Sequence, residues 1–220
     1  MLKTAKSVGL LAALLILLML AAGCGPKIYV SPDFDTVKDS HHTVAILPFK
    51  VNYDAGKLPK DIDEATLSQM QEDESMAFQQ ELYSRFLERQ AKGEYTIEFQ
   101  DVDQTKALLS KFAVDYDNID HYTKTELKEM LGVDAMISGT IRRSQPMSTG
   151  AAIAVGVLFG VSGETNRVDV NVNLHDGASG KLLWKYDHSE SGSLGSSSEG
   201  LAKSLMKGIS KKFPYKRAQT

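Results

Sequence analysis

The sequence predicts a single α/β domain in which helices pack on a mixed β-sheet. Short apolar runs rich in β-branched residues alternate with segments whose apolar side chains recur every three or four positions. In chain order the pattern is strand, helix, strand, helix, helix, strand, strand, strand, helix. Behind an N-terminal apolar segment, 197 of the 220 residues remain. That length suffices for one domain with a substantial hydrophobic core.

The first 23 residues have the layout of a secretory signal peptide. Lys3 and Lys6 precede an apolar run that ends in small residues, and the run is short for a membrane span of about 20 residues. The following stretch, Leu20-Ala21-Ala22-Gly23-Cys24, resembles the lipobox of bacterial lipoproteins. The resemblance implies cleavage before Cys24, a lipid on its thiol and an acyl chain on its new amino group. The alternative is an ordinary signal peptide that leaves a free thiol.

Composition excludes several classes of function for the mature chain. Without the two signal-peptide lysines it has 23 basic and 28 acidic residues, a net charge of −5, and no basic stripe that would indicate a nucleic-acid partner. Because Cys24 is the only cysteine, the mature fold has no internal disulfide. Residues 24–42 combine prolines with mixed charge and predict a flexible tether, residues 43–215 the domain, and residues 216–220 a tail.

The first half of the domain carries two clear elements. Residues 43–49 are continuously apolar, as in a strand buried on both faces, and Pro48 should mark its end. A loop over 52–61 and a helix over 63–90 follow, with one apolar stripe in the second half of the helix. The stripe consists of Phe78, Leu82, Phe86 and Leu87. Residues 95–99 alternate as a strand, and Asp103 is expected to cap a short helix.

The second half is predicted with more local signals. Thr123 and Glu126 fit a capping box, and the helix that they open should end at Gly132. A strand is expected over 133–141, and an alternating strand over 167–175 returns through the turn at 176–180 as a hairpin. The last helix carries an apolar stripe at spacing four. That stripe is Leu201, Leu205 and Ile209, with Ala202 and Met206 beside it.

Four motifs in this order resemble the lipoproteins related to the curli-secretion-channel (CsgG) family and to the amino-terminal domain of TolB. They are Val44-Ala45-Ile46-Leu47-Pro48-Phe49, Val133 to Ile141, the alternating Val168 to Leu174, and Asp176 to Trp184. The resemblance covers roughly residues 43–213 and implies a non-enzymatic periplasmic domain held at a membrane by lipid. Its motif residues transfer as markers of the fold: Asp134 as a strand start, Gly139 as a close backbone approach, and Trp184 as a core residue.

No group of residues predicts catalysis, a cofactor or a metal site. Asp115, Asp117 and Glu126 stand at positions one, three and twelve of a calcium loop, but position five is Ile119 and position six, which needs glycine, is Asp120. The five histidines show no ligand spacing and are expected at the surface or at strand edges. These are His41, His42, His121, His175 and His188. No nucleophile elbow or phosphate-cradling loop is present.

Residues 149–163 form an uncharged, glycine-rich insertion between two strands. Val157, Leu158 and Phe159 give it the character of an association surface for a protein or a membrane, whereas the alternative is a buried connector under the sheet. The favoured function is a lipid-anchored envelope module that binds other envelope proteins or copies of itself, with no small-molecule substrate. The alternative is an outer-membrane secretion channel built from several copies. In the lipoprotein family that the lipobox resembles, an Asp after the cysteine often retains the protein at the inner membrane, so the resemblance implies that a chain with Gly25 is sorted to the outer membrane.

Overall fold

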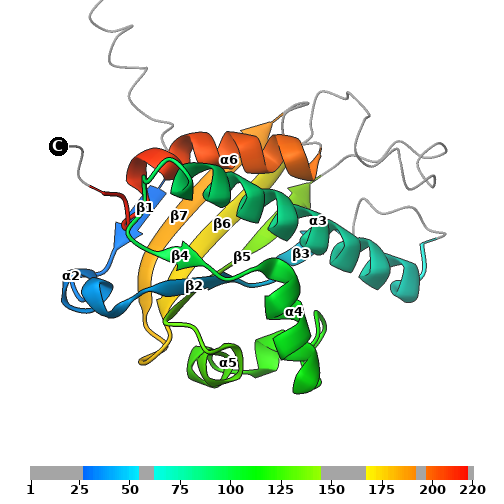
Figure 1. Cartoon of the computed structure of the whole chain (residues 1–220). Helices are drawn as coiled ribbons and strands as arrows, with labels where there is room; N and C mark the ends of the chain where they lie inside the picture. The colour runs from blue at the N-terminus through cyan, green and yellow to red at the C-terminus, as the bar shows by residue number, and fades with distance from the viewer. Residues whose placement is uncertain (1–26, 55–61, 145–166, 192–196, 218–220) are drawn as a thin grey trace, which may run out of the picture.

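A computed structural model describes residues 27–54, 62–144, 167–191 and 197–217. These residues form a seven-stranded mixed sheet with five α-helices packed on it, which confirms the predicted fold class (Figure 1). The strands are β1 (Lys27–Val30), β2 (Thr43–Ile46), β3 (Lys50–Tyr53), β4 (Glu98–Phe99), β5 (Ala135–Ser144), β6 (Arg167–Asp176) and β7 (Leu182–Ser191). The helices are α2 (Phe34–Val37), α3 (Glu64–Gln90), α4 (Val102–Lys111), α5 (Lys124–Leu131) and α6 (Ser198–Lys212).

The sheet has the strand order β1-β7-β6-β5-β2-β4, and β3 also pairs with β5. β2 is parallel to β4 and β5, whereas β5, β6, β7 and β1 form an antiparallel series. The two longest contacts, β5 with β6 and β6 with β7, join strands of ten residues each. This antiparallel half therefore contains the longest paired strands of the sheet.

β2 and β3 behave as one strand interrupted by a bulge. Both pair with β5 in parallel, and the four steps from Ile46 to Lys50 lie opposite three steps, from Ile137 to Thr140. Pro48 stands in the interruption, where its missing N–H removes no ladder hydrogen bond. The loop expected from residue 52 onward therefore begins later, because residues 50–53 continue the pairing with β5.

Two hydrophobic cores lie on opposite faces of the sheet. α3 and α6 cover one face. The α6 stripe and Phe78, Leu82 and Phe86 of the α3 stripe are buried there with β6, β7 and the aromatic residues Trp184 and Phe213, whereas Leu87 is only partly buried. α4 and α5 cover the other face, but only over β2 and β5, where Leu109, Leu127 and Met136 are buried (Figure 1). The layer of α3 and α6 therefore covers more of the sheet than the layer of α4 and α5 does.

Gly139 allows the close approach that was expected of it. A Cβ atom on Gly139 would lie 2.0 Å from the backbone oxygen of Asn171 and 2.5 Å from a ring carbon of Phe49. The absent side chain thus lets β6 and the Phe49 ring pack on the middle of β5. Asp134 also acts at a strand start, because its carboxylate accepts hydrogen bonds from the backbone N–H groups of His42 and Thr43, at 2.8 and 2.9 Å.

Most elements confirm the sequence predictions, including the helix from residue 64 to 90, the β6–β7 hairpin and the α6 stripe. The α5 capping box of Thr123 and Glu126 is formed, and Gly132 ends the helix in the left-handed conformation. Trp184 is fully buried, as predicted.

Four expectations need correction. The segment expected as a tether contains β1 and α2, because Lys27–Val30 pairs with β7 and Phe34 enters the core. The strand expected over 95–99 shortens to β4, since Tyr95 makes only an isolated bridge to Lys216. Asp101, and not Asp103, caps α4 by accepting from two backbone N–H groups. His41, expected at the surface, is 4% exposed because it hydrogen-bonds inside the fold.

Candidate functional site

Among the residues that the structure describes, no helix covers half of one sheet face, and the side chains there are polar. Along β6 the side chains alternate, so that Val168, Val170, Val172 and Leu174 are buried beneath the helices. The intervening side chains lie on the opposite face and are partly exposed: Asp169, Asn171, Asn173 and His175. The core on that face contains residues of β2 and β5 but none of β6 or β7. An antiparallel sheet commonly leaves one such face in contact with water.

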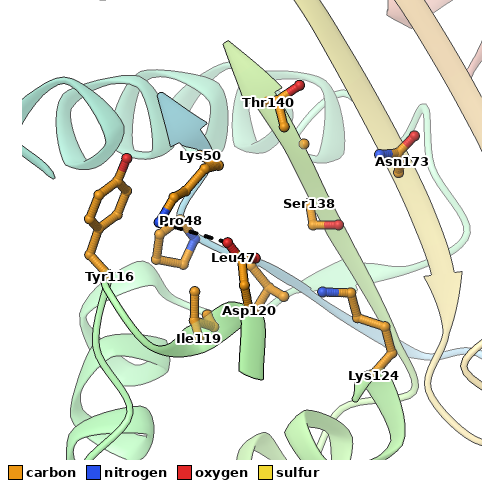
Figure 2. Close-up of a pocket in the computed structure, with 11 residues that line it drawn as sticks. Leu47, Pro48, Lys50, Tyr116, Ile119, Asp120, Lys124, Ser138, Thr140 and Asn173 are labelled. Carbon is orange, nitrogen blue, oxygen red and sulfur yellow. Dashed lines mark ion pairs between the residues drawn. The ribbon is translucent and has the colours of Figure 1, made fainter. Parts of the chain in front are cut away.

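A cavity of about 240 Å³ lies at the rim of this open face, where β5 meets α5 and the turn before it (Figure 2). Its sheet side presents the hydroxyl groups of Ser138 and Thr140 and the amide of Asn173. Its helix side presents Asp120 and Lys124. The remaining lining comes from Leu47, Pro48, Lys50, Tyr116, Ile119 and Gly139. The bulge between β2 and β3 thus forms one wall.

The charges around the cavity are two cations and one anion. The Lys50 ammonium lies 3.8 Å from a carboxylate oxygen of Asp120 and 4.8 Å from the centre of the Tyr116 ring. Burial lowers the pKa of Lys124, although the nearby Asp120 carboxylate opposes this shift. Burial, followed by the charge of Lys124, lowers the pKa of His175 to about 4. His175 is therefore a neutral imidazole at pH 7.

Hydrogen bonds hold the sheet side of the cavity in place. The Asn171 amide oxygen accepts from the Thr140 backbone N–H at 3.2 Å and from the Asn173 amide at 3.0 Å, while its own amide donates to the Thr140 hydroxyl. The cavity can offer hydrogen bonds and positive charge to a polar group. Its lining contains neither a histidine nor a cysteine, and its one carboxylate is that of Asp120.

A second polar cluster is enclosed within the fold. His41 contacts the Tyr215 hydroxyl through Nδ1 and a carboxylate oxygen of Asp176 through Nε2, at 3.0 Å, and all three residues are at most 4% exposed. Ser179 donates to the other Asp176 oxygen from its backbone and its hydroxyl. Burial raises the pKa of Asp176, but the bonds from Ser179 and His41 outweigh it, so the net shift is downward. The cluster ties three distant parts of the chain together.

A buried ion pair joins α3 to β5. The Arg143 Nε donates to a Glu74 oxygen at 2.5 Å, and both side chains are 2% exposed. The Tyr53 hydroxyl donates to the other Glu74 oxygen at 2.6 Å. Sequence reasoning missed this group, although Glu74 stands four positions before Phe78 and so extends the buried stripe of α3.

The predicted site residues Cys24, Val157, Leu158 and Phe159 lie outside the described residues. The acids weighed as calcium ligands have local tasks: Asp115 accepts from the backbone N–H groups of Asp117 and Asn118, and Glu126 belongs to the capping box. Within the described ranges, no three His, Cys, Asp or Glu residues are grouped as a metal site. Nor does any helix there have the length and apolar character to cross a bilayer.

The fold and the open polar face define a single-domain α/β protein with a surface for polar contacts. No family model and no curated protein matches the chain. Among solved structures, the chain is similar to the PelC dodecamer from Paraburkholderia phytofirmans, at 15% identity and a TM-score of 0.44 over 89% of this chain and 99% of the other. Lipoprotein GNA1162 from Neisseria meningitidis is similar at 15% identity and a TM-score of 0.44, over 78% and 96%. The LpoB C-terminal domain from Salmonella enterica follows at 10% identity and a TM-score of 0.35, over 69% and 83%. Likeness at this level assigns the chain to no family.

Proposed function

We propose that this chain is a lipid-anchored lipoprotein of the bacterial cell envelope and acts as a non-enzymatic module that binds other envelope proteins. The observation that carries the proposal is the stretch Leu20 to Cys24, which places the only cysteine at the end of a signal peptide. Two acyl chains or more at one residue suffice for stable attachment to a bilayer. The resemblance of the four motifs to the curli-secretion-channel and TolB relatives supports an envelope role.

The strands bring the chain from Cys24 and both ends of the insertion to one end of the sheet. β5 ends at Ser144 and β6 begins at Arg167, and these two residues are paired. The insertion 145–166 therefore leaves and re-enters the sheet at this end. β1 runs away from the same end. Its first residue, Lys27, pairs with Asp187, and β7 continues from Asp187 to Ser191, which pairs with Arg167. A lipid at Cys24 and the insertion would therefore both be connected to the domain from this end.

The polar chemistry of the cavity suits a binding role. On its sheet side the Thr140 hydroxyl and the Asn173 amide are both held by hydrogen bonds to Asn171, and such fixed polar groups suit recognition of a polar surface. We place the domain in the periplasm at the outer membrane, on the basis of Gly25 after the lipidated cysteine.

The second candidate function is a channel subunit, and the apolar insertion is the observation that favours it. A transmembrane strand needs about 9–11 alternating residues, whereas residues 151–155 are apolar at successive positions. We therefore favour the module.

Two measurements on the native host test the proposal. Cys24→Ala should move the protein from the membrane fraction to the soluble fraction or leave the signal uncut, and a cleaved variant that stays in the membrane would contradict the anchor. The lipidated protein extracted in mild detergent should elute as a monomer or a small complex and should carry envelope proteins with it. A large homo-oligomeric ring would favour the channel instead.

A further inference from the structure

The first strand of the domain exposes three consecutive apolar side chains. Ile28, Tyr29 and Val30 are 37, 47 and 53% exposed. Within the described part of the chain, only one other large hydrophobic residue, Phe112, is similarly exposed. β1 is also the last strand of the sheet on its side, because its one neighbour is β7. An exposed apolar edge strand favours association unless something covers it.

The short connection to Cys24 limits what can cover this edge. Three residues of fully extended chain span at most about 11 Å, so the Cα of Lys27 lies no farther than that from the Cα of Cys24. β1 begins at Lys27 and is held rigidly by four paired residues of β7. Acyl chains on Cys24 therefore bring the bilayer surface close to the first residues of β1.

The residue types of β1 suit the interface of a bilayer. Tyrosine concentrates where membrane meets water, because its ring is apolar and its hydroxyl can stay hydrated. Tyr29 lies opposite Lys185, and Lys27 stands at the start of the strand opposite Asp187, which is 3.2 Å from the Lys185 ammonium, so these three charged groups leave a net positive charge beside the apolar residues. Such a charge is attracted to anionic lipid headgroups.

We propose that the exposed edge of β1, Ile28 to Val30, lies on the surface of the membrane that holds the lipid of Cys24. The inference rests on the proposed lipoprotein function. It assigns the orientation of the domain: the β1 edge meets the bilayer, and β4 forms the edge of the sheet away from it. The open polar face of β5 and β6 is then roughly perpendicular to the membrane surface and stays accessible to a partner.

Fluorescence quenching of two single-residue variants tests this orientation. Tyr29→Trp places an indole on the β1 edge, and Phe112→Trp places a matched indole at the end of α4, where 51% of the native side chain is exposed. Each lipidated full-length variant is reconstituted in vesicles of phosphatidylethanolamine and phosphatidylglycerol with a brominated acyl chain. The native Trp184 is fully buried and gives both variants the same background.

At an interfacial depth of about 5–10 Å, the indole at position 29 should lose about half of its emission to the brominated chains, whereas the indole at 112 should lose almost none. Equal emission from both positions, in protein whose mass shows the lipid, overturns the inference and leaves the lipoprotein proposal intact. A mass without lipid overturns both. If position 29 is unquenched and the protein forms dimers that Ile28→Ser with Val30→Ser separates, the edge binds a second copy and the inference fails.

Discussion

The buried pair of Glu74 and Arg143 should dominate the response of this fold to a single charge deletion. Glu74→Gln keeps the shape of the side chain but removes the buried counter-charge that lies 2.5 Å from the guanidinium. Breaking a buried pair from one side costs about 3–5 kcal/mol, because the Arg143 charge stays buried after its carboxylate partner has become a neutral amide. The Tyr53 hydroxyl is a donor to Glu74, since burial and then the carboxylate raise the pKa of Tyr53 well above its ordinary value.

Removing both charges should cost less stability than removing Glu74 alone. Glu74→Leu with Arg143→Met leaves no unpaired charge in this pair, so the remaining loss should be the roughly 1–3 kcal/mol of the Tyr53 hydroxyl without its acceptor. Adding Tyr53→Phe should recover most of that loss. As a control, Glu129→Gln removes an exposed ion-pair partner and should cost less than about 1 kcal/mol.

Urea unfolding of the mature chain carrying Cys24→Ala measures these effects, with the buried Trp184 as the probe. The free energy of unfolding should be much lower for Glu74→Gln than for the double variant Glu74→Leu with Arg143→Met. A loss under about 1 kcal/mol for Glu74→Gln would show that the pair is open to water and would refute the reasoning.

Three further predictions concern β5, the cavity and the insertion. Gly139→Ala should lower the free energy of unfolding by about 1–3 kcal/mol or more, because the added methyl group would meet the backbone oxygen of Asn171. The neighbouring control, Ser138→Ala, should change the free energy of unfolding by less than about 0.5 kcal/mol. Equal effects of the two variants in urea unfolding would contradict the close packing at Gly139. The parent should lose stability as the pH falls from about 6.5 to about 4, because the unfolded chain protonates His175 more readily than the folded protein does. His175→Gln should remove about 1–2 kcal/mol of this loss, after allowance for solvent screening. The control variant His121→Gln changes an exposed histidine and should leave the loss as it is. Leu158→Ser with Phe159→Ser should keep the free energy of unfolding within about 1 kcal/mol while weakening co-purification with envelope partners, and a loss of about 2–5 kcal/mol per residue would place them in the core.

Local chemistry explains why most helices and the hairpin were predictable. The Thr123 capping box, the left-handed Gly132 and the α6 stripe depend on neighbours within a few residues of one another. The α3 stripe was predictable from Phe78 onward, but its continuation to Glu74 was hidden because a carboxylate is buried only with a partner, and Arg143 is 69 residues away.

Long-range pairing explains the rest. β1 and β3 are four residues each and follow no clear period, so their pairing with β7 and β5 determines them. The same holds for His41, whose partner Tyr215 is 174 residues away. The cavity was equally out of reach, because Lys50, Tyr116 and Ser138 meet only through the bulge between β2 and β3. Ser138 and Gly139 were visible in the sequence, but as markers of the fold.

The intact mass of the protein purified from membranes tests the central claim most directly. The lipoprotein proposal predicts a chain that begins at Cys24 and carries the added mass of a diacylglyceryl group on its thiol and an acyl chain on its amino group. The thiol of Cys24 should then resist alkylation after unfolding. A chain that begins elsewhere, or one whose Cys24 reacts as a free thiol, would contradict the anchor.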